Sequence, residues 1–146
     1  MRALAKELGL PESVWNRQPF PGPGLFIRVV GATPTPDLLE IVREADALVR
    51  EIVEKYKEEH KICAEVSQLV VAYMALPTTG VMGDRRAYGG YIAVRAVKTI
   101  DFMTAEGVIF PADVQREINS VVTGRLKISR VMFDSTNKPP ATTEFE

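Results

Sequence analysis

The sequence has few of the residues that build disulfide frameworks, zinc sites or membrane spans. Its 146 residues include one cysteine, Cys63, and one histidine, His60. A single cysteine excludes an internal disulfide, and the two residues together provide no His/Cys cluster for zinc. The longest apolar run, Leu69 to Leu76, is far shorter than the roughly 20 residues that span a bilayer. We therefore expect no metal site and no membrane segment.

Excess charge of either sign is also missing. Eighteen basic residues meet 19 acidic ones, which gives a formal net charge of −1, whereas a nucleic-acid partner normally requires a surplus of Lys and Arg. Hydrophobic residues make up 46% of the chain, enough for one domain with a single core at this length. The opening MRALAKELGL predicts a short amphipathic helix without the features of a signal peptide. We expect a cytoplasmic protein that binds no nucleic acid.

The hydrophobic pattern predicts alternating helices and strands behind a rigid loop. The segment ESVWNRQPFPGPG is too rich in proline and glycine for a helix. TPTPD predicts a helix start, with Thr35 or Asp37 as the cap, and Gly124 is expected to end a second helix. The predicted strands are Leu25–Val30, Val66–Pro77, Gly90–Thr99 and Ile128–Asp134, and the predicted helices are Pro36–Lys57 and the segment PADVQREINSVVTG.

Two of the expected strands are joined only by the glycine-rich segment TTGVMGDRRAYGG, which indicates an antiparallel pair. The long helix has one apolar face to lay on a sheet. Together these features predict an α+β two-layer sandwich, with a mostly antiparallel sheet of about four strands and helices packed on one face. Residues 1–24 are expected to form a linker helix and the PFPGPG loop.

Three segments favour the binding of a small anion: RQPFPGPG, GVMGDRRAYGG and the C-terminal NKPPATTEFE. Gly80 and Gly83 allow close approach of the backbone to a ligand, and arginines such as Arg86 present planar forks suited to phosphate or carboxylate. In the third segment, two prolines are expected to hold the chain extended, so that Lys138 and Glu144 keep a fixed separation. The alternative for each segment is a plain turn with solvated charges.

Other polar residues have structural explanations as alternatives. The arginines at 28, 95 and 130 fall inside expected strands, where they could line an anion-accepting surface, lie on an exposed sheet face or form ion pairs. His60 follows the long helix and is expected to supply a favourable C-terminal charge. Cys63 opens an expected strand and is most simply a small core residue.

Taken in order, four stretches carry a resemblance to a known family: RQPFPGPGLFIRVVG, GVMGDRRAYGGYIAVRAV, DFMTA and RVMFDSTNKPPATTEFE. They resemble the successive motifs of the carboxy-terminal dimerisation domain of GMP synthase, and the likeness runs from about residue 4 to the last residue. The resemblance implies a homodimer that contributes part of the pocket for xanthosine monophosphate, XMP. The tail would then be stiff because it is a binding element.

The resemblance also implies roles for particular residues. Lys138 and Arg130 are the candidates for the nucleotide phosphate, and Glu144 is the candidate for hydrogen bonds to the ribose or base. A phosphate with nearly two negative charges suits a Lys plus Arg pair. The supporting candidates for XMP binding are Thr143, Met82, Asp84, Arg86 and Arg28.

Two parts of the complete reaction have no counterpart in this sequence. GMP synthase uses ATP with Mg²⁺ to activate XMP, which requires a phosphate loop of the SGGxDS type, and no such stretch occurs. Cys63 and His60 lie close in sequence, but not in the context of a glutaminase nucleophile. We expect no catalytic residue in this chain, and partners that supply the ATP pyrophosphatase and the glutaminase as domains or subunits. The alternative is a stand-alone dimerisation or nucleotide-binding module without ligase activity.

Overall fold

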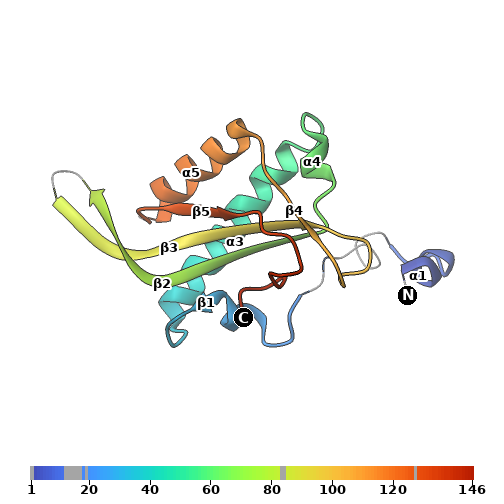
Figure 1. The fold of residues 1–146 in the computed structure, drawn as a ribbon, viewed down its shortest axis with the longest axis horizontal. Coiled ribbons are helices and arrows are strands. Elements are labelled where there is room, and N and C mark those ends of the chain that lie inside the picture. The colour runs from blue at the N-terminus through green and yellow to red at the C-terminus, as the bar shows by residue number, and fades with distance from the viewer. Residues whose placement is uncertain (1, 12–17, 19, 83–84, 127) are drawn as a thin grey trace.

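The computed structural model describes residues 2–11, 18, 20–82, 85–126 and 128–146. Within these residues it has helices and one mixed sheet, so the predicted α+β class is confirmed (Figure 1). The helices are α1 (Arg2–Glu7), the 3-10 helix η1 (Gly24–Arg28), α3 (Pro36–Lys55), α4 (Lys61–Ala64) and α5 (Ala112–Leu126). The strands are β1 (Val29–Val30), β2 (Gln68–Met82), β3 (Arg85–Lys98), β4 (Glu106–Gly107) and β5 (Val131–Asp134). No helix among the described residues is long and apolar enough to cross a membrane.

The sheet has five strands in the described part of the chain; most of its residue pairs are antiparallel, as expected, but it is mixed rather than purely antiparallel. β2 and β3 form the expected antiparallel hairpin, and β4 is antiparallel to β3. β1 pairs in parallel with β2, and β5 pairs in parallel with β3. Parallel neighbouring strands need a crossover connection, which is usually a helix. The helix α3 is the crossover between β1 and β2. The sequence prediction included this helix but did not consider that it would make the two strands parallel.

The expected strand Leu25–Val30 is wrong over most of its length. Residues Gly24–Arg28 form η1, and only Val29 and Val30 pair with β2. A short apolar run does not distinguish a strand from a tight helical turn by periodicity alone. Gly24 has a φ of +71°, which the residue adopts without the penalty of a side chain. The turn places Arg28 in the interior, where it is 1% exposed.

The segment expected to be a turn, residues 78–90, instead extends the hairpin. Strand pairing continues as far as Met82 and Arg85, and the two strands project beyond the helices as an arm (Figure 1). Gly80 and Gly90 allow close approach of neighbouring segments. A Cβ added at Gly80 would lie 2.3 Å from the Cβ of Ser129, and one added at Gly90 would lie 2.4 Å from the carbonyl oxygen of Met74.

The helices agree more closely with their predictions. Thr35 is the N-cap of α3, and its hydroxyl accepts a hydrogen bond from the Leu38 amide at 3.3 Å. The helix α5 continues two residues past Gly124, which therefore does not end it.

The last predicted strand, Ile128–Asp134, begins three residues later than expected, at Val131. Cys63 is fully buried as expected, but it lies in α4 rather than at the start of a strand.

The two faces of the sheet are covered by different parts of the chain. Side chains from α3 and α5 pack with alternate residues of β2 and β3, including Val71 and Val94, in one apolar cluster. The intervening residues point to the opposite face. They too are buried, and the chain after β5 crosses this face (Figure 1). The buried residues of this second face include Val70, Ala72, Ala93, Arg95 and Val97.

Candidate functional site

The C-terminal tail, residues 135–146, folds around the guanidinium of Arg95. The Arg95 side chain comes from the centre of the sheet and is 1% exposed. Its Nη1 donates to the carbonyl oxygen of Thr136 at 2.8 Å and to Asp134 at 3.0 Å, and its Nε donates to the carbonyl oxygen of Thr142 at 3.0 Å. Hydrogen bonds from a charged donor are stronger than neutral ones. Arg95 therefore fixes both ends of the central part of the tail.

A second buried arginine holds the end of the tail. Arg28 donates to the two carboxylate oxygens of Glu144 at 3.1 and 3.3 Å, and to Asp46 of α3 at 3.2 Å. Gln68 donates to Glu144 at 3.4 Å. Arg28 also lies over the ring of Phe20, 5.3 Å from its centroid. The segment before η1, the helix α3 and the last residues of the chain thus meet at one guanidinium.

Lys138 lies in another part of the tail, at an open pocket of about 660 Å³. Its backbone pairs with Ala105 through two hydrogen bonds of 2.8 and 2.9 Å. Its Nζ donates to the carbonyl oxygen of Phe102 at 2.6 Å. Lys98, Asp101 and Glu106 also line the pocket. The ion pair of Lys98 with Glu65, at 2.7 Å, raises the pKa of Lys98. The pocket therefore combines two ammonium groups with two carboxylates.

The two prolines of the tail do not hold the chain extended. Residues 137–141 form a turn that is closed by a hydrogen bond from the Ala141 amide to the Asn137 carbonyl at 3.1 Å. The peptide bonds before Pro139 and Pro140 are both cis. The expectation of an extended segment was wrong, because proline restricts φ but leaves the overall direction of the chain to its hydrogen-bonding context.

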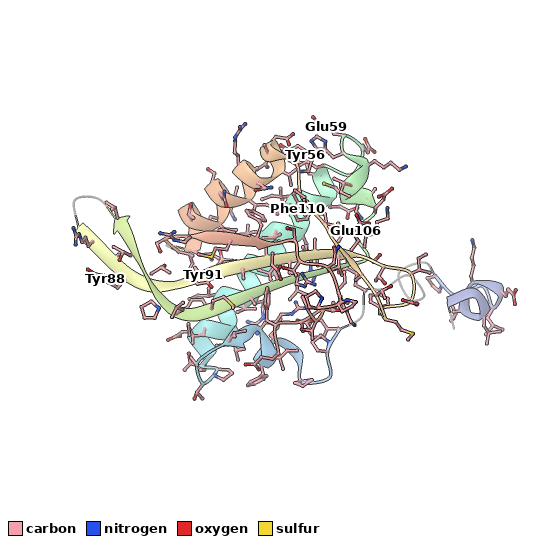
Figure 2. All side chains as sticks on the ribbon, viewed as in Figure 1. Tyr56, Glu59, Tyr88, Tyr91, Glu106 and Phe110 are labelled. Carbon is pink, nitrogen blue, oxygen red and sulfur yellow. The ribbon has the colours of Figure 1, made fainter. Side chains whose placement is uncertain are left out.

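The remaining predicted site residues are dispersed. Arg130 is exposed and lies immediately before β5, where its carbonyl accepts a hydrogen bond from the Ile92 amide, whereas the tail leaves the opposite end of that strand. Four strand residues separate the two ends by roughly 13 Å. Arg86 is on the hairpin arm, and Figure 2 shows Tyr88 of this arm far from Glu106 at the pocket. Thr143 is half-buried in the tail. Asp84 and the side chain of Met82 lie outside what the structure describes.

The single cysteine and histidine do not face each other as a catalytic pair. The Nε2 of His60 lies 2.7 Å from Asp113, and its ring stacks on Tyr56. Burial raises the pKa of the Cys63 thiol, which disfavours the thiolate that a nucleophile requires. His60 was expected to provide a C-terminal helix charge, and it contacts the start of α5 instead.

Sequence reasoning missed three residues that shape the tail: Asp46, Gln68 and Asp134. Arg95 was noticed as a strand arginine but was not assigned to the site. The sequence did contain a sign that Arg95 is buried, because it lies within the apolar stretch YIAVRAV, which is typical of a fully buried strand. Asp46 gave a weaker signal, as a carboxylate among the alanines and valines of the helix face. No local pattern indicated that these residues would meet the tail.

Comparison with known proteins identifies the family. The family model described as the GMP synthase C terminal domain matches residues 54–145. The chain belongs to this family. It is 47% identical over its whole length to a GMP synthase (glutamine-hydrolyzing) subunit from Pyrococcus furiosus, and 48% identical to the corresponding subunit from Methanopyrus kandleri. It is 44% identical to GMP synthase (glutamine-hydrolyzing) of Coxiella burnetii, again over the whole chain.

The match covers only part of each relative. This GMP synthase C-terminal domain spans 45% of the Pyrococcus furiosus protein, 46% of the Methanopyrus kandleri protein and 27% of the Coxiella burnetii protein. The resemblance seen in the sequence motifs is thus confirmed at the level of the family.

Proposed function

We propose that this chain is the dimerisation and XMP-binding part of a GMP synthase, which converts XMP to GMP with ATP and glutamine-derived ammonia in the cytoplasm. The observation that carries the proposal is the position of Lys138. Its ammonium group lies at an open pocket and donates to one backbone carbonyl, that of Phe102. A phosphate oxygen can replace that neutral acceptor with a charged one, which forms a stronger hydrogen bond.

The carboxylate of Glu144 is held in place and can accept a further hydrogen bond, which would be a second contact with the nucleotide. A carboxylate accepts about four hydrogen bonds, and Arg28 and Gln68 supply three to Glu144. A ribose hydroxyl can add another. Because Lys138 and Glu144 are held by separate anchors, we infer that the segment between them closes over the nucleotide. Thr143 belongs to this segment.

The dimer is supported by the hairpin arm, which carries apolar side chains into solvent. Val81 is 76% exposed, Tyr88 69% and Leu76 64%. Arg86 and Arg130, which lie toward the arm, would reach a nucleotide only from a second copy of the chain. Sedimentation at micromolar concentration is expected to give a homodimer, and a monomer at those concentrations would contradict this part of the proposal.

The complete reaction requires an ATP pyrophosphatase and a glutaminase, as domains or subunits in addition to this chain, and the former would bring the sites for ATP and Mg²⁺. The alternative function is a stand-alone nucleotide-binding or dimerisation module. Adding an ATP pyrophosphatase subunit to the chain and assaying GMP formation distinguishes the two functions.

Calorimetric titration of XMP tests the binding role of Lys138. Lys138→Ala is expected to weaken XMP binding by about 1.5 to 3 kcal/mol, because a charge-assisted hydrogen bond is lost. Lys57→Ala, which removes a lysine after α3, is the control and should bind XMP normally. Normal XMP affinity in the Lys138 variant would end the proposal for the tail.

A further inference from the structure

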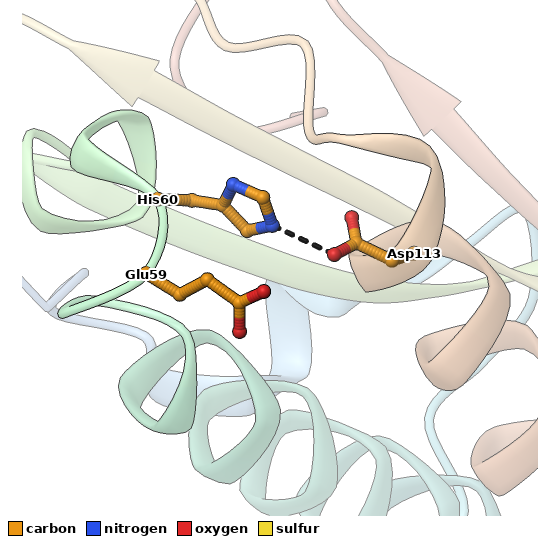
Figure 3. Close-up of side chains that lie close together, drawn as sticks. All are labelled: Glu59, His60 and Asp113. Atoms are coloured by element: carbon orange, nitrogen blue, oxygen red, sulfur yellow. Dashed lines mark hydrogen bonds and ion pairs between the residues drawn. The ribbon is translucent and has the colours of Figure 1, made fainter.

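A cluster of three possible metal ligands lies in the helical layer, away from the tail. Glu59 and His60 belong to the turn between α3 and α4, and Asp113 is in the first turn of α5 (Figure 3). One ligand atom from each residue lies within 4.8 Å of the others. The Nε2 of His60 and the Oδ2 of Asp113 are 2.7 Å apart. We propose that Glu59, His60 and Asp113 form a binding site for a divalent transition-metal cation, with Zn²⁺ as the first candidate.

The donor set fits this class of cation. One imidazole nitrogen and two carboxylate oxygens suit Zn²⁺ and its first-row neighbours, and bonds of about 2.0 to 2.2 Å hold such ligands roughly 3.3 Å apart. The pair of His60 and Asp113 must therefore open by less than about 1 Å. Glu59 is exposed, so its side chain can rotate toward the cation without displacing packed groups. Three protein ligands leave at least one position for water.

Two of the three ligands are already oriented. The ring of His60 stacks on Tyr56 with the centroids 5.6 Å apart and the planes inclined by 22°. The Oδ1 of Asp113 accepts a hydrogen bond from the Val114 amide at 2.9 Å, which leaves Oδ2 directed at His60. Such supporting contacts reduce the loss of conformational freedom when a ligand is bound.

The lysines near the cluster form their ion pairs with acidic residues other than Glu59 and Asp113. Lys55 and the hydroxyl of Tyr56 both bind Glu117, the acidic residue one turn beyond Asp113. Lys61, the nearest lysine in sequence, pairs with Glu65 at 3.6 Å. A divalent cation would match the charge of Glu59 and Asp113, and it would tie the turn after α3 to α5. The competing role is a simple ion pair between His60 and Asp113.

Because His60 is the only histidine, its imidazole resonances report on the site without assignment. We would titrate ZnCl₂ into chelator-treated protein that carries no histidine tag, following heat and the ¹⁵N shifts of the imidazole. The expected result is one Zn²⁺ per chain, with a change at Nε2 that saturates at the same ratio. Co²⁺ should give visible absorption bands of a site with nitrogen and oxygen ligands.

Substitutions of the three ligands distinguish a specific Zn²⁺ site from non-specific attraction of the cation to acidic side chains. His60→Ala and Asp113→Asn should each weaken Zn²⁺ binding at least about tenfold, since loss of supporting residues alone costs that much. Glu59→Gln should weaken it too, whereas the matched neighbour Glu58→Gln should not. Circular dichroism checks that each variant is folded. Equal Zn²⁺ affinity of the wild type and His60→Ala, or equal losses in the Glu58 and Glu59 variants, would overturn the proposal, as would Co²⁺ bands typical of thiolate ligation by Cys63.

Discussion

The face of the sheet under α3 and α5 is covered by apolar side chains, whereas the face under the tail is organised around the buried guanidinium of Arg95. On the helix face, Val49, Val94 and Ile118 belong to one continuous apolar cluster. On the tail face, Arg95 binds two carbonyl oxygens and one carboxylate, and Arg28 joins the tail to α3 at the edge. Both arginines are 1% exposed.

The two faces are held by different kinds of interaction, and these have different consequences for the stability of the domain and for the ability of the tail to rearrange. Apolar burial is non-directional and stabilises the whole domain. Charge-assisted hydrogen bonds hold one geometry, and ligand groups of matching charge can replace them. We infer that the helix face carries the free energy of folding and that the tail face carries a segment able to reorganise around a nucleotide. Substitutions on the two faces should therefore have different consequences.

The largest expected effect is on the helix face. Ile118→Ala in α5 removes a fully buried side chain, and it should lower the free energy of unfolding by about 2 to 5 kcal/mol because a cavity is left behind. Urea denaturation measures the change. Ser120→Ala, on the exposed side of α5, is the control and should change stability little. A loss below about 1 kcal/mol in the Ile118 variant would show that this face is not the main source of stability.

On the tail face, Arg95→Met should act locally. The substitution keeps much of the side-chain length but leaves Asp134 and the carbonyls of Thr136 and Thr142 without their donor. We expect a loss of about 1.5 to 3 kcal/mol, together with faster amide exchange in residues 136–142 than in α5. Arg116→Met, an exposed arginine of α5, is the control. Uniform acceleration of exchange across both regions would contradict a separable tail.

The sequence predicted the helix face well and the tail face poorly. The pattern from Leu38 to Tyr56 identifies α3 because each apolar residue recurs at helical spacing, and the spacing is a local property. The bonds from Arg28 to Glu144 join residues 116 positions apart. Nothing near either residue indicates the other, so the burial of Arg28 was not predictable from a single sequence.

The candidate site shows the same limit. The family motifs singled out Lys138 and Glu144, and the structure places them on separate anchors of one tail. The motifs did not indicate that Gly80 of the hairpin is needed for packing, because Gly80 is close to Ser129 only after β5 has been placed beside β3. Close approach between distant segments follows from topology, and the crossovers that set this topology were not predicted.

A smaller effect is expected at the start of α3, where the helix face begins. Thr35→Ala removes the hydroxyl that accepts from the Leu38 amide and should cost about 1 kcal/mol. Thr35→Ser should retain most of that stability. Thermal unfolding of the two variants gives the comparison, with the nearby exposed Thr33→Ala as control. Equal losses in the serine and alanine variants would indicate that the cap hydrogen bond contributes nothing.

The smallest expected effect at neutral pH is that of Asp134→Asn, and its dependence on pH identifies its origin. Burial raises the pKa of Asp134, but hydrogen bonds from Thr136 and the charge of Arg95 outweigh it and leave the pKa below the usual aspartate value. The folded state therefore favours the ionised carboxylate, while part of its interaction is screened by solvent. The extra stability of the wild type over Asp134→Asn should be fully present above the unfolded aspartate pKa of about 3.9.

This difference should then shrink as the pH falls through the lower pKa of the folded state, because protonation removes the charge that Arg95 binds. Urea denaturation from pH 7 to pH 2 measures it. When Asp134→Asn is introduced into the Arg95→Met variant, its effect on stability should be smaller at neutral pH and should change less between pH 7 and pH 2, since the partner charge is absent. An effect of Asp134→Asn that is independent of pH, or unchanged in that background, would show that Asp134 acts through packing and that the tail face does not depend on charge.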